Sequence, residues 1–316
     1  MSHVVLNVSQ SIMNEMKENY NQFKQDKHPP GSLFAAKVPG CTITAYNSGK
    51  VLFQGKSAEE ESGKWGKSSV SSKPKAKPSI KEPTKYSPPA DIGKLSIVGS
   101  DEVGTGDYFG PITVVAAFVA KEQIPLLKEL GVRDSKNLKD PQIIAIARDL
   151  VKTVPYSLLT LPNEKYNQLQ RKGYSQGKMK ALLHNKAIQH VMQKVDGQEV
   201  DGILIDQFAK PDVYFGYLSR EKSVVRENVF FETKAEGIHL AVAAASIIAR
   251  YAFVQHMDNL SEAAGFPIPK GAGKQVDIAA AQIINSKGLQ ALEKFAKVHF
   301  ANTDKAKVLA QKAKRP

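Results

Sequence analysis

The sequence predicts an α/β fold with a mixed five-stranded sheet flanked by helices, preceded by a small α+β unit. Two observations predict it. In residues 91–316, five short apolar segments are separated first by a turn and later by segments with helical spacing, which is typical of a mixed sheet. In residues 1–66, strand-like segments accompany one helix-like segment, and a stretch rich in Pro, Ser and Lys follows them.

Composition limits the classes of function. The chain has 316 residues, of which 42% are apolar, so it can bury one large core or two ordinary ones. Its 44 Lys+Arg and 31 Asp+Glu residues give a formal net charge of +13. This charge favours an anionic partner, nucleic acid before an acidic membrane surface. The single cysteine, Cys41, excludes an intramolecular disulfide framework and a multi-cysteine zinc site.

The sequence also predicts where the protein resides. No uninterrupted apolar run approaches the roughly 18 residues that cross a bilayer. Residues 1–10 lack the basic and apolar pattern of a signal peptide. We therefore expect no membrane segment and a cytoplasmic protein, which agrees with the scarcity of cysteine. One cysteine and no internal repeat make a monomer the default expectation.

The amino-terminal unit is predicted over residues 1–66. Apolar residues at 4-4-3 spacing indicate a helix over residues 11–27, which Pro29-Pro30-Gly31 ends. Four strands are predicted, at residues 4–8, 33–38, 42–46 and 51–54. The unit contains no cluster of acids or histidines, so we expect it to bind rather than to catalyse.

Residues 67–90 are predicted to form a basic linker. Between residues 66 and 90 the chain has five prolines, six serines and six lysines but only one acid, Glu82. Little of this stretch can be buried, so it should be extended and solvated. The alternative is a basic strap that also contacts phosphates.

The larger unit is predicted over residues 91–316, ending in carboxyl-terminal helices and a basic, solvated tail. Its strands are predicted at residues 95–100, 112–120, 156–161, 202–205 and 228–232. Helices are predicted at residues 143–151, 178–195 and 238–257, the last rich in alanine. His184, His190, His239 and His256 do not have the spacing of metal ligands.

Acidic residues end two of the predicted strands. Asp101 and Glu102 follow the first strand, and Asp206 follows the fourth. Adjacent residues on a regular strand point to opposite faces, so Asp101 and Glu102 can act together only if the chain bends there, which Gly104 and Gly106 allow. Sites in open α/β sheets form where strands end, which would bring these acids together. The alternative is that they are ordinary turn or capping residues.

A fourth acid, Glu236, precedes the alanine-rich helix. It can either cap that helix electrostatically or complete a carboxylate cluster. Four carboxylates without cysteine or a histidine motif select hard divalent cations, Mg²⁺ or Mn²⁺. In a basic protein such a pocket points to phosphodiester chemistry, in which two ions about 3.5–4 Å apart activate water and stabilise the leaving oxygen.

Five groups of residues resemble type 2 ribonucleases H in order and spacing. They are Asp101-Glu102-Val103-Gly104-Thr105-Gly106-Asp107-Tyr108-Phe109-Gly110-Pro111, Asp134-Ser135-Lys136, Asp206-Gln207-Phe208, Thr233-Lys234-Ala235-Glu236 and residues 243–250 (AAASIIAR). The turn GTGDYFGP at 104–111 is longer than that of ribonuclease HII and resembles bacterial ribonuclease HIII. Residues 41–55 (CTITAYNSGKVLFQG) resemble the TATA-binding protein-like domain of ribonuclease HIII, so the resemblance covers nearly the whole chain.

The resemblance implies a ribonuclease H-like catalytic domain and endonucleolytic cleavage of the RNA strand of RNA–DNA hybrids, giving 5′-phosphate and 3′-hydroxyl ends. It implies Asp101, Glu102, Asp206 and Glu236 as catalytic metal ligands for two Mg²⁺ or Mn²⁺ ions, with Asp101 bridging them. No separate general base is needed, because a metal-bound water has a depressed pKa.

Substrate contacts are also expected from the resemblance. Gly104, Thr105 and Gly106 should present backbone groups to ribose 2′-hydroxyls, which distinguish RNA from DNA. Thr105 stands where ribonuclease HII has Arg, so we expect a requirement for a run of ribonucleotides rather than a single one. The candidate phosphate contacts are Ser135, Lys136, Lys178 and Lys234, although residues 134–136 also suit a helix-capping surface turn.

The small unit should add affinity by binding the hybrid, through strand residues Lys37, Thr42, Thr44, Tyr46 and Lys50. Three alternatives remain. The first is a ribonuclease HII-like enzyme that cuts at single ribonucleotides, and the second is a non-catalytic hybrid-binding protein. The third, a transposase or integrase with the same acids, is disfavoured by the turn at 104–111 and the helix at 243–250.

Overall fold

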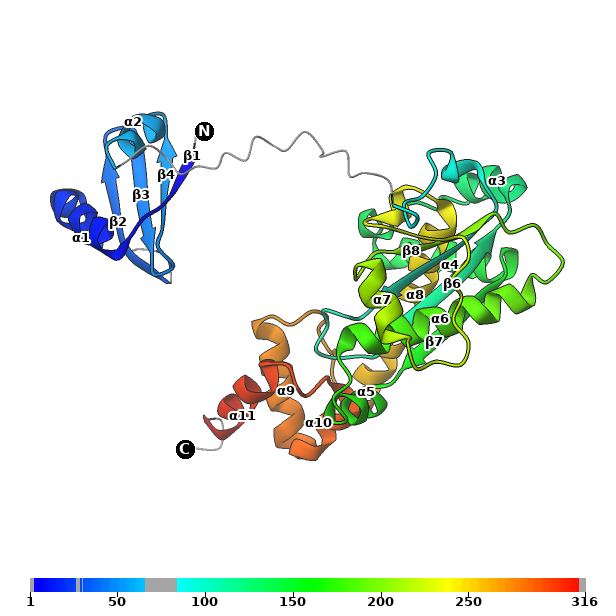
Figure 1. Cartoon of the computed structure of the whole chain (residues 1–316). Coiled ribbons are helices and arrows are strands. Elements are labelled where there is room, and N and C mark those ends of the chain that lie inside the picture. The colour runs from blue at the N-terminus through cyan, green and yellow to red at the C-terminus, as the bar shows by residue number, and fades with distance from the viewer. Residues whose placement is uncertain (1–2, 27–28, 30, 66–83, 313–316) are drawn as a thin grey trace. The chain divides into compact units, whose positions relative to one another are not determined.

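The structure is a computed structural model that describes residues 3–26, 29, 31–65 and 84–312 (Figure 1). The chain divides into two compact units, residues 1–82 and 83–316, which are described separately. The predicted linker lies outside the described residues as far as residue 83. Its last part differs from the prediction, because Tyr86 packs on the second unit: its ring centroid is 5.4 Å from that of Phe215, and its carbonyl accepts a hydrogen bond from Phe231.

The first unit is a four-stranded antiparallel sheet in the order β1-β4-β3-β2. The strands are β1 (His3–Asn7), β2 (Ser32–Val38), β3 (Cys41–Tyr46) and β4 (Lys50–Gly55). Two helices, α1 (Gln10–Asn19) and α2 (Ala58–Gly63), pack with the sheet around one core. The predicted helix over residues 11–27 is shorter than expected, because Asn21–Phe23 form a 3₁₀ turn instead.

Alternation along the strands separates the two faces of this sheet. Ile43, Ala45, Val51 and Phe53 are buried in the core of the unit. Their neighbours in sequence therefore point to the other face. That outer face carries Lys37, Thr42, Thr44, Tyr46, Lys50, Leu52 and Gln54.

The second unit contains the predicted mixed five-stranded sheet, in the order β7-β6-β5-β8-β9. Its strands are β5 (Ile97–Val103), β6 (Ile112–Val119), β7 (Tyr156–Leu161), β8 (Gly202–Asp206) and β9 (Val229–Glu232). β6 pairs antiparallel with β5 and β7, whereas β8 lies parallel to β5 and β9. The parallel strands β5 and β8 therefore end at the same edge, where the sequence has its acids.

Helices cover both faces of the sheet (Figure 1). On one face, α8 (Leu240–Ala264) and α4 (Asp140–Thr153) share a core with the sheet. On the other, α6 (Gln176–Lys194) and α7 (Pro211–Tyr217) form a second core. The connection between β6 and α4 contains the short helix α3 (Ile124–Glu129).

Helix α8 approaches β5 very closely at Gly99. A Cβ atom at Gly99 would lie 2.2 Å from the backbone nitrogen of Val242. Among the described residues, α8 alone has the length and hydropathy of a membrane span, but 72% of its most apolar window is buried inside the fold. It is therefore the central core helix of the unit.

A third core lies between α8 and the carboxyl-terminal helices, and it includes Tyr108 and Phe109 of the turn at 104–111. The carboxyl-terminal helices are α9 (Lys274–Lys287), α10 (Leu292–Phe295) and α11 (Asn302–Lys312), and α5 (Asn163–Arg171) packs on α10. The predicted solvated tail is wrong as far as residue 312, because α11 buries Ala306 and Ala310 against this core.

Candidate active site

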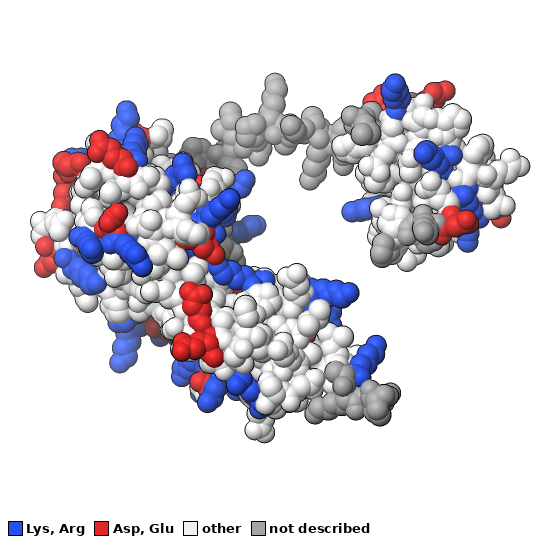
Figure 2. Space-filling model, turned by 180° about the vertical axis from the view of Figure 1, so that it is seen from behind, with Lys and Arg blue, Asp and Glu red and all other residues white. Residues whose placement is uncertain are grey.

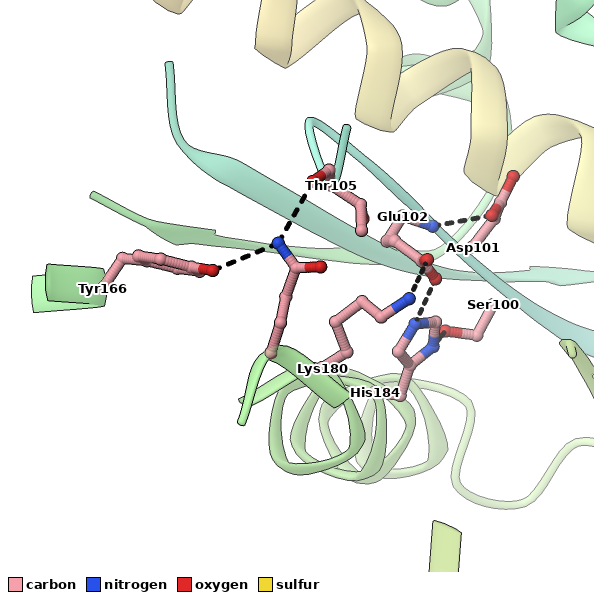
Figure 3. Close-up of polar contacts among 8 residues, drawn as sticks. Ser100, Asp101, Glu102, Thr105, Tyr166, Lys180 and His184 are labelled. Atoms are coloured by element: carbon pink, nitrogen blue, oxygen red, sulfur yellow. Dashed lines mark hydrogen bonds and ion pairs between the residues drawn. The ribbon is translucent and has the colours of Figure 1, made fainter. Parts of the chain in front are cut away.

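Asp101 and Glu102 lie on a regular part of β5. They pair with Val115 and Val114 of β6, and the strand continues to Val103. The predicted bend at the two acids is therefore wrong, because the turn begins only at Gly104, whose φ is +93°. As Figure 3 shows, the Asp101 side chain points towards α8 and the Glu102 side chain points towards α6.

Asp101 is buried at the edge of the sheet, with 7% of its surface exposed. Its carboxylate accepts a hydrogen bond from Ser246 of α8 and one from the backbone of Glu102 at 2.7 Å. Burial, followed by the negative charges of Glu102 and Asp206, raises the pKa of Asp101 to about 8. The site thus concentrates negative charge around Asp101.

Asp206 and Glu236 lie near Asp101. Asp206 ends β8, and its Oδ1 accepts a hydrogen bond of 3.0 Å from the backbone of Ala235. Burial raises the pKa of Asp206, and the charges of Glu236 and Glu102 add to that effect. Glu236 is 4% exposed and forms an ion pair with Lys136 through Oε1. Its Oε2 is buried and has no hydrogen-bond partner.

Glu102 is held by two residues of α6. Lys180 Nζ donates to Oε1 at 2.7 Å, and His184 Nε2 donates to Oε2 at 2.9 Å (Figure 3). Burial would raise the pKa of Glu102, but the hydrogen bonds and charges of His184 and Lys180 outweigh it and lower the pKa to about 2. The other ring nitrogen of His184 lies 2.7 Å from Ser100 Oγ, which fixes the ring.

Phe208 supports this pair of α6 residues. The Lys180 ammonium lies 4.1 Å from the centroid of the Phe208 ring, and the His184 ring stacks on the same ring at 5.0 Å. Lys180 and His184 are four residues apart on one helix, so both reach the same carboxylate. Glu102 is therefore ionised and fixed in one orientation.

The four acids suit a divalent cation by chemistry rather than by a finished ligand geometry. Among the described residues, no three His, Cys, Asp or Glu side chains converge as a metal site. The donors are carboxylate oxygens, which Mg²⁺ and Mn²⁺ prefer. The unpartnered Oε2 of Glu236 and the like charges around Asp101 are what a cation would satisfy. The residues present therefore fit such an ion.

The turn at 104–111 presents a free side at Thr105 and Gly106. Gly106 is exposed, and a Cβ atom there would meet nothing within 4 Å. Thr105 Oγ1 is buried without a partner, while its carbonyl accepts a hydrogen bond of 3.1 Å from Gln176. Gly104 has no such space, because a Cβ atom would lie 2.2 Å from the carbonyl oxygen of Pro111.

The four candidate phosphate contacts differ in their exposure and in the residues that they contact. Lys136 lies at the acids, with 67% of its side chain exposed. Ser135 is buried, and its hydroxyl lies 2.9 Å from that of Ser246, the residue that binds Asp101. Lys178 stacks over the Tyr174 ring at 4.1 Å, and Lys234 is exposed with a left-handed φ of +57°.

Sequence reasoning missed Lys180, His184 and Ser246. The spacing of the histidines argues against a metal site, but it does not reveal that His184 is the partner of a carboxylate. A signal was present: Lys180 lies between Met179 and Ala181 on a helix whose buried side includes all three. A buried lysine requires an anionic or polar partner, and Glu102 is that partner.

Comparison with known proteins gives the family. Residues 98–303 match the family model described as Ribonuclease HII, and residues 3–78 match a domain of unknown function, DUF3378. Ribonuclease HIII of Bacillus subtilis (strain 168) is 61% identical over 312 residues, which cover 99% of both chains. The chain belongs to the ribonuclease HIII family.

Solved structures agree with this assignment to the ribonuclease HIII family. The crystal structure of Bst-RNase HIII in complex with Mn²⁺ is 46% identical, covers 98% of this chain and 100% of that one, and has a TM-score of 0.69. Aquifex aeolicus RNase H3 is 26% identical, with a TM-score of 0.54 and coverage of 93% and 99%. These findings confirm the predicted fold and the predicted class of enzyme, a ribonuclease of this family. The Mn²⁺ ion of that crystal structure is bound by Bst-RNase HIII.

Proposed function

We propose that this member of the ribonuclease HIII family cleaves the RNA strand of RNA–DNA hybrids by two-metal-ion hydrolysis, giving 5′-phosphate and 3′-hydroxyl ends. The observation that carries the proposal is the group of four carboxylates at one sheet edge, where Asp101 has a pKa of about 8 and Glu236 keeps a buried, unpartnered oxygen. When bound, divalent cations supply a water of lowered pKa and positive charge for the scissile phosphate.

Asp101, Glu102, Asp206 and Glu236 are the residues that would hold the ions. Asp101, Asp206 and Glu236 reach the site from the α8 side, and Ser246 orients Asp101. Glu102 comes from the other face, where Lys180 and His184 keep it ionised. Lys136 is proposed to leave Glu236 and contact a phosphate when the ions bind, because most of its side chain is already exposed. Lys178 and Lys234 are further candidate phosphate contacts.

The turn is proposed to recognise ribose. Gly104 shapes it, while Thr105 and Gly106 present backbone groups to 2′-hydroxyls, supported by the open space around Gly106. Because Thr105 provides no long cationic side chain, we propose that a run of ribonucleotides is required. Ser135 is proposed to act on substrate only through its backbone and Ser246, since its hydroxyl is buried.

The outer face of the amino-terminal sheet is proposed to bind the same hybrid. The five predicted contact residues, Lys37, Thr42, Thr44, Tyr46 and Lys50, all point to this face by their register. On the face that Figure 2 shows, Lys and Arg lie over both units with acids among them. The net charge of +13 should add a general attraction for the anionic hybrid. We further propose a cytoplasmic monomer.

The test compares four end-labelled duplexes: RNA–DNA, DNA–DNA, RNA–RNA, and DNA with one embedded ribonucleotide. Each is incubated with Mg²⁺, Mn²⁺ or EDTA. We expect metal-dependent cutting of the RNA–DNA hybrid, little cutting at the single ribonucleotide, and loss of cutting in Asp101→Asn. Asp149→Asn, which removes an exposed acid of α4, is the matched control and should retain activity.

Two results would change the proposal. Efficient cutting at the single ribonucleotide would indicate the ribonuclease HII-like specificity. Binding of the hybrid without cutting under any metal would leave a non-catalytic binding protein. Size-exclusion chromatography with light scattering tests the monomer.

A further inference from the structure

Lys297 is a completely buried lysine outside the acid cluster. It has no exposed surface, and it lies between α10 and α11, far along the chain from the turn at 104–111. None of the ion pairs formed by the described residues involves it. Burying an ammonium without a carboxylate is costly, so a lysine at this position needs a reason other than packing.

The Lys297 ammonium bonds to the turn at two points. Nζ donates to the carbonyl oxygens of Asp107 at 2.8 Å and Gly110 at 2.5 Å. The backbone nitrogen of Lys297 also donates to the carbonyl of Tyr108 at 2.8 Å. One residue thus satisfies three of the turn's carbonyls. Burial lowers the pKa of Lys297 to about 7, which the charge of Asp107 partly opposes.

Lys297 is itself held rigidly. Asn167 of α5, which is 1% exposed, donates to the carbonyl of Ala296 at 2.8 Å and accepts from the backbone of Val298 at 3.1 Å. The ammonium also lies 5.8 Å from the centroid of the Tyr166 ring. The segment that carries Lys297 is therefore fixed on both sides of that residue.

The residues around Lys297 are also connected to the exposed part of the turn. The Tyr166 hydroxyl accepts a hydrogen bond of 3.1 Å from Gln176 Nε2, which also donates to the carbonyl of Thr105. The carbonyls of Thr105, Asp107 and Gly110 are all hydrogen-bonded, whereas Gly106, between the first two, is exposed. The orientation of the Gly106 backbone therefore depends on contacts from α5, α6 and Lys297.

We propose that Lys297 is a positioning residue that sets the orientation of the Thr105–Gly106 backbone and thereby the preference for ribose over deoxyribose. The inference rests on the proposed role of this turn in recognising the hybrid. Lys297 has no exposed surface, and its ammonium bonds to the turn rather than to the four acids. Its removal should therefore change which duplex is bound and leave metal binding intact.

The experiment measures binding of fluorescent RNA–DNA and DNA–DNA duplexes by anisotropy, in EDTA so that no cleavage occurs, in the full-length protein. The readout is the ratio of the two dissociation constants. In Lys297→Met this ratio should move towards one by about tenfold. The reason is that a reoriented turn would lose one or two of its hydrogen bonds to the ribose 2′-hydroxyls. The affinity for Mn²⁺, measured by calorimetry, should stay within twofold, an estimate of about 0.4 kcal/mol.

Two controls separate positioning from stability. Lys294→Met removes an exposed lysine of α10 and should leave the ratio unchanged. Ile283→Val weakens the same carboxyl-terminal core by about 1 kcal/mol without removing any hydrogen bond to the turn, and should lower the melting temperature but not the ratio. A purely structural role for Lys297 would make Lys297→Met behave like Ile283→Val.

Each outcome decides the matter. An unchanged ratio in folded Lys297→Met overturns the proposal. If that variant does not fold, Lys297→Gln is measured. Its side chain is one bond shorter and should not reach both the Asp107 and Gly110 carbonyls, so an unchanged ratio there overturns the proposal equally. If the wild-type protein itself does not prefer the hybrid, the proposed recognition by the turn is what has failed.

Discussion

Asp101 and Glu102 are neighbours in sequence, yet their carboxylates lie on opposite faces of the catalytic sheet. Asp101 contacts Ser246 of α8, whereas Glu102 contacts Lys180 and His184 of α6. The two acids consequently have opposite pKa shifts, to about 8 and about 2. At this site Asp101 lies among negative charges that a cation would offset, whereas Glu102 already has two hydrogen-bond donors.

Removing the cation beside Glu102 should destabilise the protein strongly. Lys180→Met leaves a buried carboxylate with His184 as its remaining side-chain donor, and we expect a loss of about 3–5 kcal/mol in the free energy of unfolding. Urea denaturation measures it. Glu102→Gln in the same chain should recover part of the loss, because the uncompensated charge is gone.

The control for Lys180→Met is the exposed pair between Arg171 and Glu293, whose side chains are 54% and 37% exposed. Arg171→Met should cost less than about 1 kcal/mol. Equal losses for the two variants would show that the buried pair contributes no more than a surface pair.

Removing the charge of Asp101 should stabilise the metal-free protein at high pH. Its folded pKa is about 8, above the usual value of 3.8, so its contribution to stability is present below pH 4 and is lost as the pH rises to 8. In EDTA at pH 8, Asp101→Asn should be more stable than wild type by about 2 kcal/mol.

Two further conditions check the Asp101 prediction. At pH 5 the difference between Asp101→Asn and wild type should shrink, because the folded wild-type acid is then protonated. Mg²⁺ at pH 8 should raise the stability of wild type and not of the variant. If the free energies of unfolding of the two proteins differ by the same amount under all three conditions, the predicted accumulation of negative charge is contradicted.

The close approach of α8 to β5 should not tolerate a side chain at position 99. A Cβ atom there would lie 2.2 Å from Val242 N, so Gly99→Ala should cost about 3 kcal/mol and lower kcat, because α8 carries Ser246. Thermal unfolding and hybrid cleavage measure the two effects. Gly216→Ala, on α7 where nothing lies within 4 Å, should be neutral or slightly stabilising.

His239 should make stability fall in mild acid. It is 2% exposed, its Nδ1 caps α8 by accepting from Ala241, and burial lowers its pKa to about 4 although the bond to Leu95 opposes this. The folded pKa lies below the unfolded value of 6.5, so the neutral ring contributes stability that decreases as the pH falls through this interval.

The variant His239→Asn keeps an acceptor for the cap but does not titrate. Between pH 7 and 5, wild type should lose about 2 kcal/mol more than this variant in urea denaturation. If both lose the same amount, protonation of His239 is not what weakens the fold in acid.

Strand positions and the sheet were predictable because apolar runs bounded by turns carry a strong local signal. The five strands of the catalytic sheet lie within a few residues of their predicted places. The orientation of Asp101 and Glu102 was mispredicted because we assumed that both acids must share a face. Alternation along β5 holds through both residues, and Gly104 bends the chain only afterwards.

Contacts between distant segments had no local signal. The bonds from Lys180 and His184 to Glu102 join residues 78 and 82 positions apart. The lysines of α11 predict a basic, solvated tail, but its small apolar residues pack against the carboxyl-terminal core. The charge of α11 is evident from its sequence, but its burial depends on which other helices pack against it.

The anchoring of the turn at 104–111 has a consequence for synthesis on the ribosome. The Tyr108 hydroxyl bonds to Thr303, 195 positions later, and Lys297 is made almost as late. At about 5–20 residues per second, the strand and its acids wait about 10–40 s for those partners. A nascent chain therefore carries the acids of the site long before it can shape the turn beside them, because that turn waits until residues 297 and 303 have been made.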